Sequence, residues 1–241
     1  MSQNIMVKQM PLSQPVFPLN IRGVKDVFPG FALGDFAVLQ GSSVLSLASL
    51  LCVKSQLPQQ MGGLQSNVIF IDGGNSFRLY QIAQLSQIHH LNPKKVLDSI
   101  YISRAFTAYQ AAALIRHHLK EIVKKYDAKL IIISDIAGFF LDKDISEVET
   151  QRIFSHVMTF LSNFARESQT IIIATYPRHE ESSRNDLLHR QTCQRANVIL
   201  SLSRNSYART ISLEKHPYLS AGSVELPGES LNIADFAEVN A

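Results

Sequence analysis

Short apolar runs recur along the chain, and the clearest is KLIIISD at residues 129–135. A run of β-branched residues closed by a polar residue is typical of a strand that is buried on both faces of a parallel sheet. Its last residue, Asp135, would then lie at the carboxyl edge of the sheet, where α/β proteins bind ligands. Two interpretations remain open from the run alone: the carboxylate holds a metal-bound water, as in nucleotide-hydrolysing folds, or it caps the following turn.

Other runs of this kind alternate with segments whose apolar residues recur at helical spacing. Strands are predicted at residues 35–39, 68–72, 99–103 and 170–175. Helices are predicted at residues 77–88, after an N-cap at Thr107 and from about Glu149, whereas residues 44–53 fit either a helix or a long buried segment. The alternation predicts an α/β fold with a mostly parallel central sheet and helices on both faces.

The C-terminal part has a different pattern, with three strand-like runs and no helices between them. These runs lie at residues 198–202, 210–214 and 223–226. Short consecutive strands joined by turns pair in antiparallel order, so we expect C-terminal antiparallel strands that extend one edge of the same sheet.

The first 22 residues show no periodicity and contain three prolines, which predicts an N-terminal arm that is extended or partly disordered. Its apolar cluster at residues 16–19 would either form a strap over the domain's own core or add a strand to a neighbouring subunit. The expected organisation is therefore an arm at 1–22, a core domain at 23–230 and a tail at 231–241.

Composition narrows the class of protein. A chain of 241 residues, 46% of them hydrophobic and 18% charged, has enough apolar material for one folded α/β domain and is not a disordered chain. The net charge of +3 permits contact with nucleic acid without requiring it. No apolar stretch is long enough to span a membrane. Cys52 and Cys193 lack metal-ligand spacing, which favours a reducing compartment: cytoplasmic, or nuclear in a eukaryote.

The turn expected at residues 40–43, QGSS, lies between a strand and the segment that begins at Val44. A strand, a loop of small residues and a helix form the layout that cradles phosphate. The phosphate-loop pattern G-x-x-x-x-G-K-[ST] is absent, however, because Val44 and Leu45 follow the turn. A turn of small residues alone is weak evidence for nucleotide binding.

Several separated segments resemble the ATPase core of the RadA recombinases of archaea and their eukaryotic relatives. The segments are QLP at 56–58, GGL at 62–64, VIFIDGGNSFR at 68–78, residues 81–106, KLIIISD at 129–135 and the C-terminal strands at 196–226. The resemblance covers about residues 30–226 and leaves no room for the helix-hairpin-helix domain of full-length recombinases. It implies a RecA-like P-loop NTPase core, ATP between adjacent subunits and DNA bound by two loops near the filament axis.

The chain departs from that family at its catalytic positions. In the register of the resemblance the phosphate loop falls on residues 38–45, with Val44 at the lysine position and Leu45 at the Mg²⁺-binding threonine position. Gly74 stands where the family has its catalytic glutamate, so only the Walker B acid remains, as Asp135. Because phosphoryl transfer depends on positioned charges, we expect no ordinary ATP hydrolysis and no catalytic residues.

We accordingly expect no cofactor and no metal site, unless the degenerate loop still binds ATP and Mg²⁺. The remnant of a nucleotide site would comprise Gly41, Ser42, Ser43 and Asp135. The small residues of the turn could still accept an anion.

The two DNA loops that the resemblance implies differ in charge. The first corresponds to residues 141–149, which are acidic and would repel phosphate. The second corresponds to residues 176–195, a basic stretch that we expect to be a loop. It would either contact a phosphate backbone without reading sequence or be an ordinary solvated loop. The candidate DNA-binding residues are Arg178, Arg184, Arg190 and Arg195.

The resemblance also places Lys215 and His216 near a neighbouring subunit's nucleotide, where they would complete an active partner's site in trans or lie as ordinary surface residues. The combined prediction is a non-catalytic recombinase paralogue. It would assemble as a homo- or hetero-oligomer with a recombinase or other paralogues and modulate strand-exchange filaments on single-stranded DNA in recombinational repair. The alternatives are a scaffold of the same fold without DNA binding and an ATPase with a non-standard phosphate loop.

Overall fold

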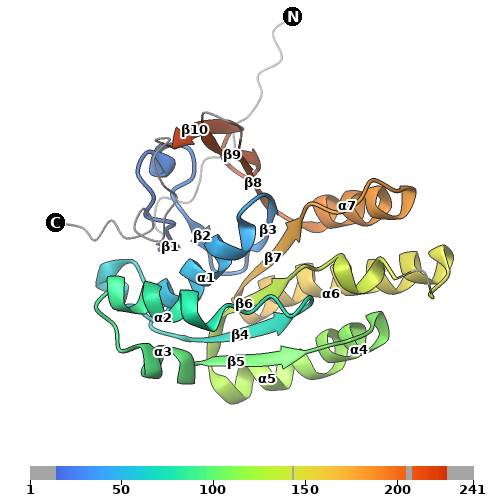
Figure 1. Cartoon of the computed structure of the whole chain (residues 1–241), viewed down its shortest axis with the longest axis horizontal. Helices are drawn as coiled ribbons and strands as arrows, with labels where there is room; N and C mark the ends of the chain where they lie inside the picture. The colour runs from blue at the N-terminus through green and yellow to red at the C-terminus, as the bar shows by residue number, and fades with distance from the viewer. Residues whose placement is uncertain (1–14, 143, 205–207, 227–241) are drawn as a thin grey trace, which may run out of the picture.

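The computed structural model describes residues 15–142, 144–204 and 208–226. Its centre is an eight-stranded sheet with the order β10-β9-β8-β3-β7-β6-β4-β5 (Figure 1). The strands are β3 (Phe36–Gly41), β4 (Asn67–Asp72), β5 (Ile100–Arg104), β6 (Ala128–Ser134), β7 (Ile171–Pro177), β8 (Val198–Arg204), β9 (Arg209–Lys215) and β10 (Gly222–Leu226). The pairs from β8 to β5 are parallel, and the pairs β8–β9 and β9–β10 are antiparallel.

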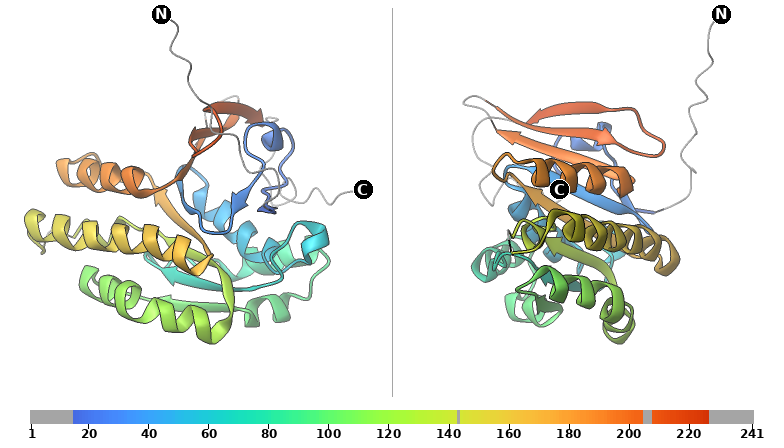
Figure 2. Two further views of the ribbon diagram at one scale, coloured as in Figure 1. Left: turned by 180° about the vertical axis from the view of Figure 1, so that it is seen from behind. Right: turned by 90° about the vertical axis from the view of Figure 1, so that its right-hand side faces the viewer.

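Helices cover both faces of this sheet, as Figure 2 shows from two further sides. One face carries α1 (Val44–Lys54), α2 (Leu79–Ile88) and α3 (Pro93–Asp98). The other carries α4 (Ala108–Ala113), the π-helix η3 (Leu114–His118), α5 (Leu119–Tyr126), α6 (Glu147–Ser168) and α7 (Ser183–Arg195). The 3₁₀ turns are η1 (Val24–Asp26), η2 (Gln59–Met61) and η4 (Gly138–Phe140).

Alternate residues of each central strand supply the two cores. In β3, Ala37 and Leu39 pack towards α1, whereas Phe36 and Val38 pack towards α6. Side chains of successive strand residues point to opposite faces, so a strand between two helical layers is apolar throughout. The RecA-like α/β fold with a mostly parallel sheet is therefore as predicted, and so are the C-terminal antiparallel strands.

The apolar cluster of the N-terminal arm packs on the domain's own core. Residues 16–21, which we call the N-terminal strap, begin with β1 (Val16–Phe17), which pairs with β2 (Phe31–Ala32). Phe17, Leu19 and Ile21 are buried. Of the two interpretations of the cluster, the structure shows the strap; residues 1–14 of the arm and the tail at 231–241 lie outside the described residues.

The strap is tied down by Lys54, the last residue of α1. Its ammonium group donates to the carbonyl oxygens of Pro18 at 2.9 Å and Leu19 at 2.8 Å, and the whole residue is 1% exposed. Burial lowers the pKa of Lys54 to about 7. Beyond the strap, Phe28 meets the ring of His216 at a centroid distance of 6.1 Å, which joins the N-terminal segment to the end of β9.

Three local expectations need correction. The stretch 176–195 is not one loop, because β7 continues to Pro177 and α7 occupies Ser183–Arg195. The expected turn at residues 40–43 is shorter, since Gln40 and Gly41 belong to β3. The helix after Thr107 begins at the predicted cap but is interrupted by the π-helix η3. Short α3, which Asn92 caps, was not predicted.

Candidate functional site at the carboxyl edge of the sheet

The parallel strands end at one edge of the sheet, the carboxyl edge, and polar side chains gather there. Gln40 lies near the end of β3, Asp72 ends β4 and Arg104 ends β5. Asp135 directly follows β6, and Tyr176 lies near the end of β7. A cavity of about 450 Å³ opens beside β4, β5 and η4, and another of about 520 Å³ opens beside β3, β7 and β8. This is the edge at which open α/β sheets bind ligands.

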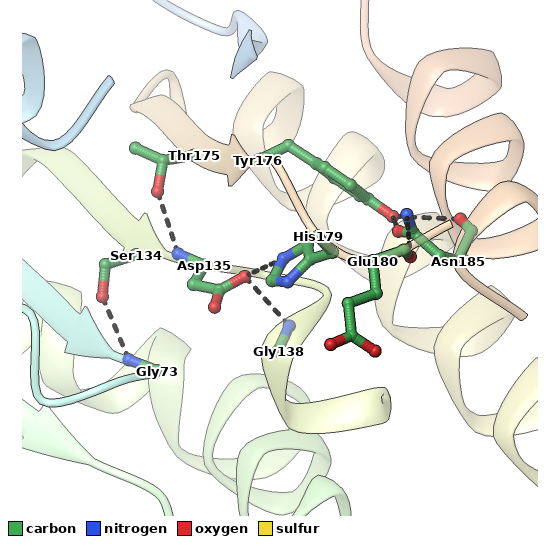
Figure 3. Close-up of polar contacts among 9 residues, drawn as sticks. All are labelled: Gly73, Ser134, Asp135, Gly138, Thr175, Tyr176, His179, Glu180 and Asn185. Carbon is green, nitrogen blue, oxygen red and sulfur yellow. Dashed lines mark hydrogen bonds and ion pairs between the residues drawn. The ribbon is translucent and has the colours of Figure 1, made fainter. Parts of the chain in front are cut away.

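Asp135 is fixed by three contacts (Figure 3). Its backbone N–H donates to Thr175 Oγ1 at 2.9 Å, and its Oδ1 accepts from the Gly138 N–H at 3.0 Å. The same oxygen lies 2.8 Å from His179 Nε2. Asp135 has a φ of 49°, a left-handed conformation that aspartate tolerates better than most residues. The contact with Gly138 is the turn-capping geometry, and the metal-holding role of Asp135 stays a prediction.

The loop after β7, which carries His179, is held by a second set of hydrogen bonds. The Tyr176 hydroxyl lies 2.7 Å from Asn185 Oδ1 and 3.1 Å from the Asn185 carbonyl, and Asn185 Nδ2 donates to the Glu180 carbonyl at 3.2 Å (Figure 3). Burial and then the charge of Asp135 raise the pKa of Tyr176, so the phenol keeps its proton and serves as a donor. These bonds join the loop to the first turns of α7.

The side chain of Asp72 is fully buried, and its carboxyl group remains ionised. Burial opposes its charge, but hydrogen bonds from Ser76, Phe77 and Ser134 outweigh burial and hold the pKa of Asp72 below its ordinary value. Arg104 Nε lies 3.5 Å from Asp72 Oδ2. The carboxylate thus orders the loop after β4 and positions Arg104.

The turn that the sequence predicted as the remnant of a phosphate loop is closed onto β8. Gly41 pairs with Leu202 and Pro177 as part of β3, and both the N–H and the hydroxyl of Ser42 donate to the Leu202 carbonyl, at 2.8 and 3.2 Å. Gly41 has a φ of 100°, and a Cβ there would lie 2.2 Å from that carbonyl oxygen. Ser43 adopts a left-handed conformation before α1 and makes no side-chain cap. Asp135, which follows β6, contacts His179 and not the residues of this turn.

A polar network joins α7 to the sheet beside this loop. Gln40 Nε2 donates to Ser201 Oγ and Glu214 Oε2, both at 2.8 Å, and Gln40 Oε1 lies 2.8 Å from His189 Nε2. Cys193 lies 3.5 Å from the same histidine nitrogen. Burial and the charge of Glu214 raise the pKa of Cys193, so its sulfur stays a neutral thiol. The network fixes α7 and offers no activated nucleophile.

Arg184, one of the four candidate DNA-binding arginines, is engaged within the chain. Its guanidinium donates to the carbonyl oxygens of Asp142 and Ile145, the latter at 2.8 Å. It therefore fastens α7 to the connection between β6 and α6.

The other three arginines are exposed but do not form one patch. Arg178 follows β7 at the carboxyl edge, Arg190 lies within α7 and Arg195 ends it. A helix rises about 1.5 Å per residue, so the two ends of α7 are about 20 Å apart. The arginines are thus spread from the end of β7 to the end of α7.

Lys215 and His216 both make contacts within their own chain. Lys215 Nζ donates to the carbonyls of Cys193 and Gln194 at 2.9 and 3.3 Å, where a cation suits the C-terminus of α7. His216 Nδ1 accepts two backbone N–H groups of the following turn, and its ring packs on Phe28. Burial lowers the pKa of His216, although Asp35 opposes this.

The acidic connection that was expected at residues 141–149 is shorter in the structure. Glu147 and Glu149 belong to the first turn of α6, where Ser146 caps the helix by accepting the Glu149 N–H at 3.3 Å. Acidic side chains favour that end of a helix. Lys143 lies outside the described residues.

Sequence reasoning missed the contact of Asp135 with His179, and it missed Arg104 and Phe106, which line one cavity at the carboxyl edge. Forty-four residues separate Asp135 from His179, so no local pattern links them. Arg104 and Phe106 could have been noticed, because they directly follow a predicted strand.

The described residues contain neither a cluster suited to a metal ion nor a helix suited to a membrane. Within 15–142, 144–204 and 208–226, no three histidine, cysteine, aspartate or glutamate side chains lie together as they would around a metal ion. No helix in the same ranges has the length and apolar character needed to cross a membrane.

The sheet order, the helices on both faces and the polar carboxyl edge define a RecA-like α/β core. A family model described as Rad51 matches residues 34–197, which is more than half of the chain. The chain therefore belongs to the Rad51 family.

A named relative agrees with this family. The DNA repair and recombination protein RadA of Cenarchaeum symbiosum (strain A) is 25% identical over 138 residues, which cover 56% of this chain and 34% of the relative. The match thus spans about a third of that protein's length.

Proposed function

We propose that this chain is a non-catalytic member of the Rad51 family that assembles with a recombinase or its paralogues and modulates filaments on single-stranded DNA in recombinational repair. The observation that most directly supports this proposal is a complete RecA-like sheet in which the turn at the position of the phosphate loop is closed onto β8. Family membership and the printed name of the RadA relative support the link to recombination and repair.

The closed turn argues against ordinary binding of Mg²⁺-ATP. A phosphate cradle needs backbone N–H groups directed at the ligand and a lysine that reaches the terminal phosphates. Here the N–H of Ser42 is bonded to Leu202, and buried Val44 stands at the lysine position. Loss of one positioned charge typically lowers a catalytic rate by about a hundredfold or more. These residues do not fit a triphosphate, and no catalytic step is assigned to them.

The exposed arginines support contact with a DNA backbone. Arg178, Arg190 and, at the end of α7, Arg195 are exposed. Arg184 serves as an anchor of α7, so its contribution would be to hold the helix in place. Contacts of this kind neutralise phosphates without reading sequence.

Assembly with other subunits is part of the same proposal. Lys215 could support a neighbour's nucleotide only by leaving the carbonyls at the end of α7. We therefore expect its trans role to appear only in the assembled state. Mixing the chain with an active recombinase and measuring that enzyme's ATP turnover, with Lys215→Met as the variant, would test this role: a variant as effective as wild type would remove it.

The experiment that tests the proposal is a titration with a fluorescent ATP analogue and with single-stranded DNA at two salt concentrations. We expect no saturable ATP binding and DNA binding that weakens with salt. Replacing Arg178 and Arg190 with glutamine should lower the salt slope by about 1.4, because each phosphate contact on a single strand contributes about 0.7. Replacing Lys120 and Lys124 of α5 instead is the control with the same charge change.

Each outcome has a defined meaning. Saturable, Mg²⁺-dependent ATP binding would refute the reading of the closed turn. DNA binding that is unaffected by the arginine substitutions would mean that other residues contact the DNA. Absence of DNA binding, with or without a recombinase partner, would favour a pure scaffold.

A further inference from the structure

The cavity of about 450 Å³ at the carboxyl edge has chemistry that the closed phosphate turn does not use. It lies beside β4, β5 and η4, whereas the remnant phosphate turn lies at the end of β3. Arg104, Phe106, Gly74 and Asp142 are among its lining residues. The lining thus combines an aromatic ring, a cation, a carboxylate and exposed backbone.

Phe106 is the most unusual member of this lining. Its residue is 84% exposed, although phenylalanine is ordinarily a core residue. The backbone beneath it is ordered, because the Phe106 N–H donates to Gln110 Oε1 at 2.9 Å in the first turn of α4. An aromatic ring presented in this way at the mouth of a cavity suits stacking on a planar partner.

Arg104 is positioned without being enclosed. Its Nε faces the buried Asp72 carboxylate at 3.5 Å, while 51% of the Arg104 side chain remains exposed. Asp72 stays charged because its hydrogen bonds hold its pKa low, so the ion pair persists at neutral pH. A guanidinium held at one nitrogen can still present a planar pair of donors to a ligand.

The remaining lining supplies space and an acceptor. A Cβ added at Gly74 would meet no atom closer than Asp135 Oδ2 at 3.8 Å, so the cavity is open at this residue. The carboxylate of Asp142 also lines the cavity and accepts the Asp144 N–H through one oxygen. A nearby carboxylate disfavours a phosphate group but can accept from an exocyclic amine or from a ring N–H such as that of thymine.

We propose that this cavity binds a nucleobase, with Phe106 as the stacking platform, Arg104 as the donor and Asp142 as the acceptor to the base edge. The ring, the donor and the acceptor together match a planar heterocycle with both kinds of polar group. The base belongs either to single-stranded DNA, in which case the inference rests on the proposed function, or to a free nucleotide held by its base.

Substitution of the platform itself provides a reporter. The chain contains no tryptophan, so Phe106→Trp places a single indole at the cavity and keeps an aromatic ring there. The variant is titrated with an oligothymidylate and, separately, with AMP and GMP, while indole fluorescence and, for the oligonucleotide, anisotropy of an end label are recorded. Stacking on a base should quench the indole.

Phe106→Ala tests the energetic contribution. Stacking of one base on an aromatic side chain typically changes affinity by about fivefold to a hundredfold, so this variant should bind the occupying ligand weaker by about tenfold. Tyr80→Ala is the matched control, because Tyr80 is also 84% exposed but does not line the cavity. Circular dichroism confirms that the variants fold.

The outcomes separate the two proposals. Quenching by oligothymidylate, or by AMP or GMP alone, supports the base site and identifies the source of the base. Oligothymidylate binding with no quenching by any of the ligands, and with Phe106→Ala as tight as Tyr80→Ala, overturns the base site while the proposed DNA function stands. If the oligonucleotide does not bind but AMP or GMP quenches the indole, only DNA association is refuted. Indole fluorescence that does not change with any ligand overturns the base site.

Discussion

Lys54 should make the stability of this protein rise with pH above neutrality. Its ammonium group is buried at the end of α1, and burial lowers its pKa to about 7 from an ordinary 10.5. Between these values the unfolded chain binds a proton that the folded chain does not bind. The free energy of unfolding therefore increases with pH across this window, and below about pH 7 the folded protein bears the full penalty of a buried charge.

The size of the effect follows from the same pKa values. One pKa unit corresponds to about 1.4 kcal/mol, so two pH units above 7 would contribute at most about 2.7 kcal/mol. The carbonyls of Pro18 and Leu19 accept from Lys54 and favour its charged form, which reduces this gain. We expect about 1 to 2.5 kcal/mol between pH 7 and about pH 9.

The assay compares wild type with Lys54→Met, which keeps an unbranched side chain one heavy atom shorter and removes its titration. Urea unfolding followed by far-ultraviolet circular dichroism at several pH values gives the free energy of unfolding for each protein. The difference, wild type minus variant, should grow with pH by the amount given above. Lys120→Met on the exposed side of α5 is the control and should give a constant difference.

A difference between wild type and Lys54→Met that stays flat over this pH range would refute the reasoning. It would mean that water reaches the ammonium group, and hence that the N-terminal strap does not seal the end of α1 as the structure describes.

Three further predictions concern the turn, the carboxyl edge and α7. Gly41→Ala should destabilise the protein by about 2 to 4 kcal/mol, because its Cβ would meet the Leu202 carbonyl, whereas Gly74→Ala has space and should change stability little; thermal unfolding compares them. Asp135→Ala should lower the free energy of unfolding in urea by about 1 to 3 kcal/mol, through loss of the contacts with Gly138 and His179, and an unchanged midpoint would contradict this. Ser182→Ala removes the N-cap of α7 and should lower stability by about 1 kcal/mol in the same assay, while exposed Ser183→Ala serves as its control.

The sheet could be predicted from the sequence because its central strands are apolar on both faces and short. Residues 129–134 contain Leu130 and three consecutive isoleucines between Lys129 and Ser134, a pattern that is typical of a buried strand. The same reasoning failed for α7, in which only Leu188 and Thr192 are buried. Tertiary contacts stabilise that helix, including those of Arg184 and Lys215, and no local pattern records them.

The candidate site was predictable in position more than in geometry. A carboxylate at the end of a buried strand indicated that Asp135 lies at the carboxyl edge, and it does. Its partner His179 lies in the loop after β7, the strand that pairs with β6, so their contact depends on the topology of the sheet. The closed turn after Gly41 follows from pairing with β8, which lies about 160 residues further along the chain.

The contact between the two ends of the described chain has a consequence for biosynthesis. Phe28 packs on His216, and Gly23 lies beside Val224 of β10. A ribosome makes residues 23–28 before most of the sheet, yet the surface on which this segment rests is completed only when residues 209–226 have emerged. Contacts of such long sequence separation form late and slowly. During synthesis, therefore, the apolar ring of Phe28 is exposed until almost the whole domain has left the exit tunnel, which is the interval in which a chaperone would engage it.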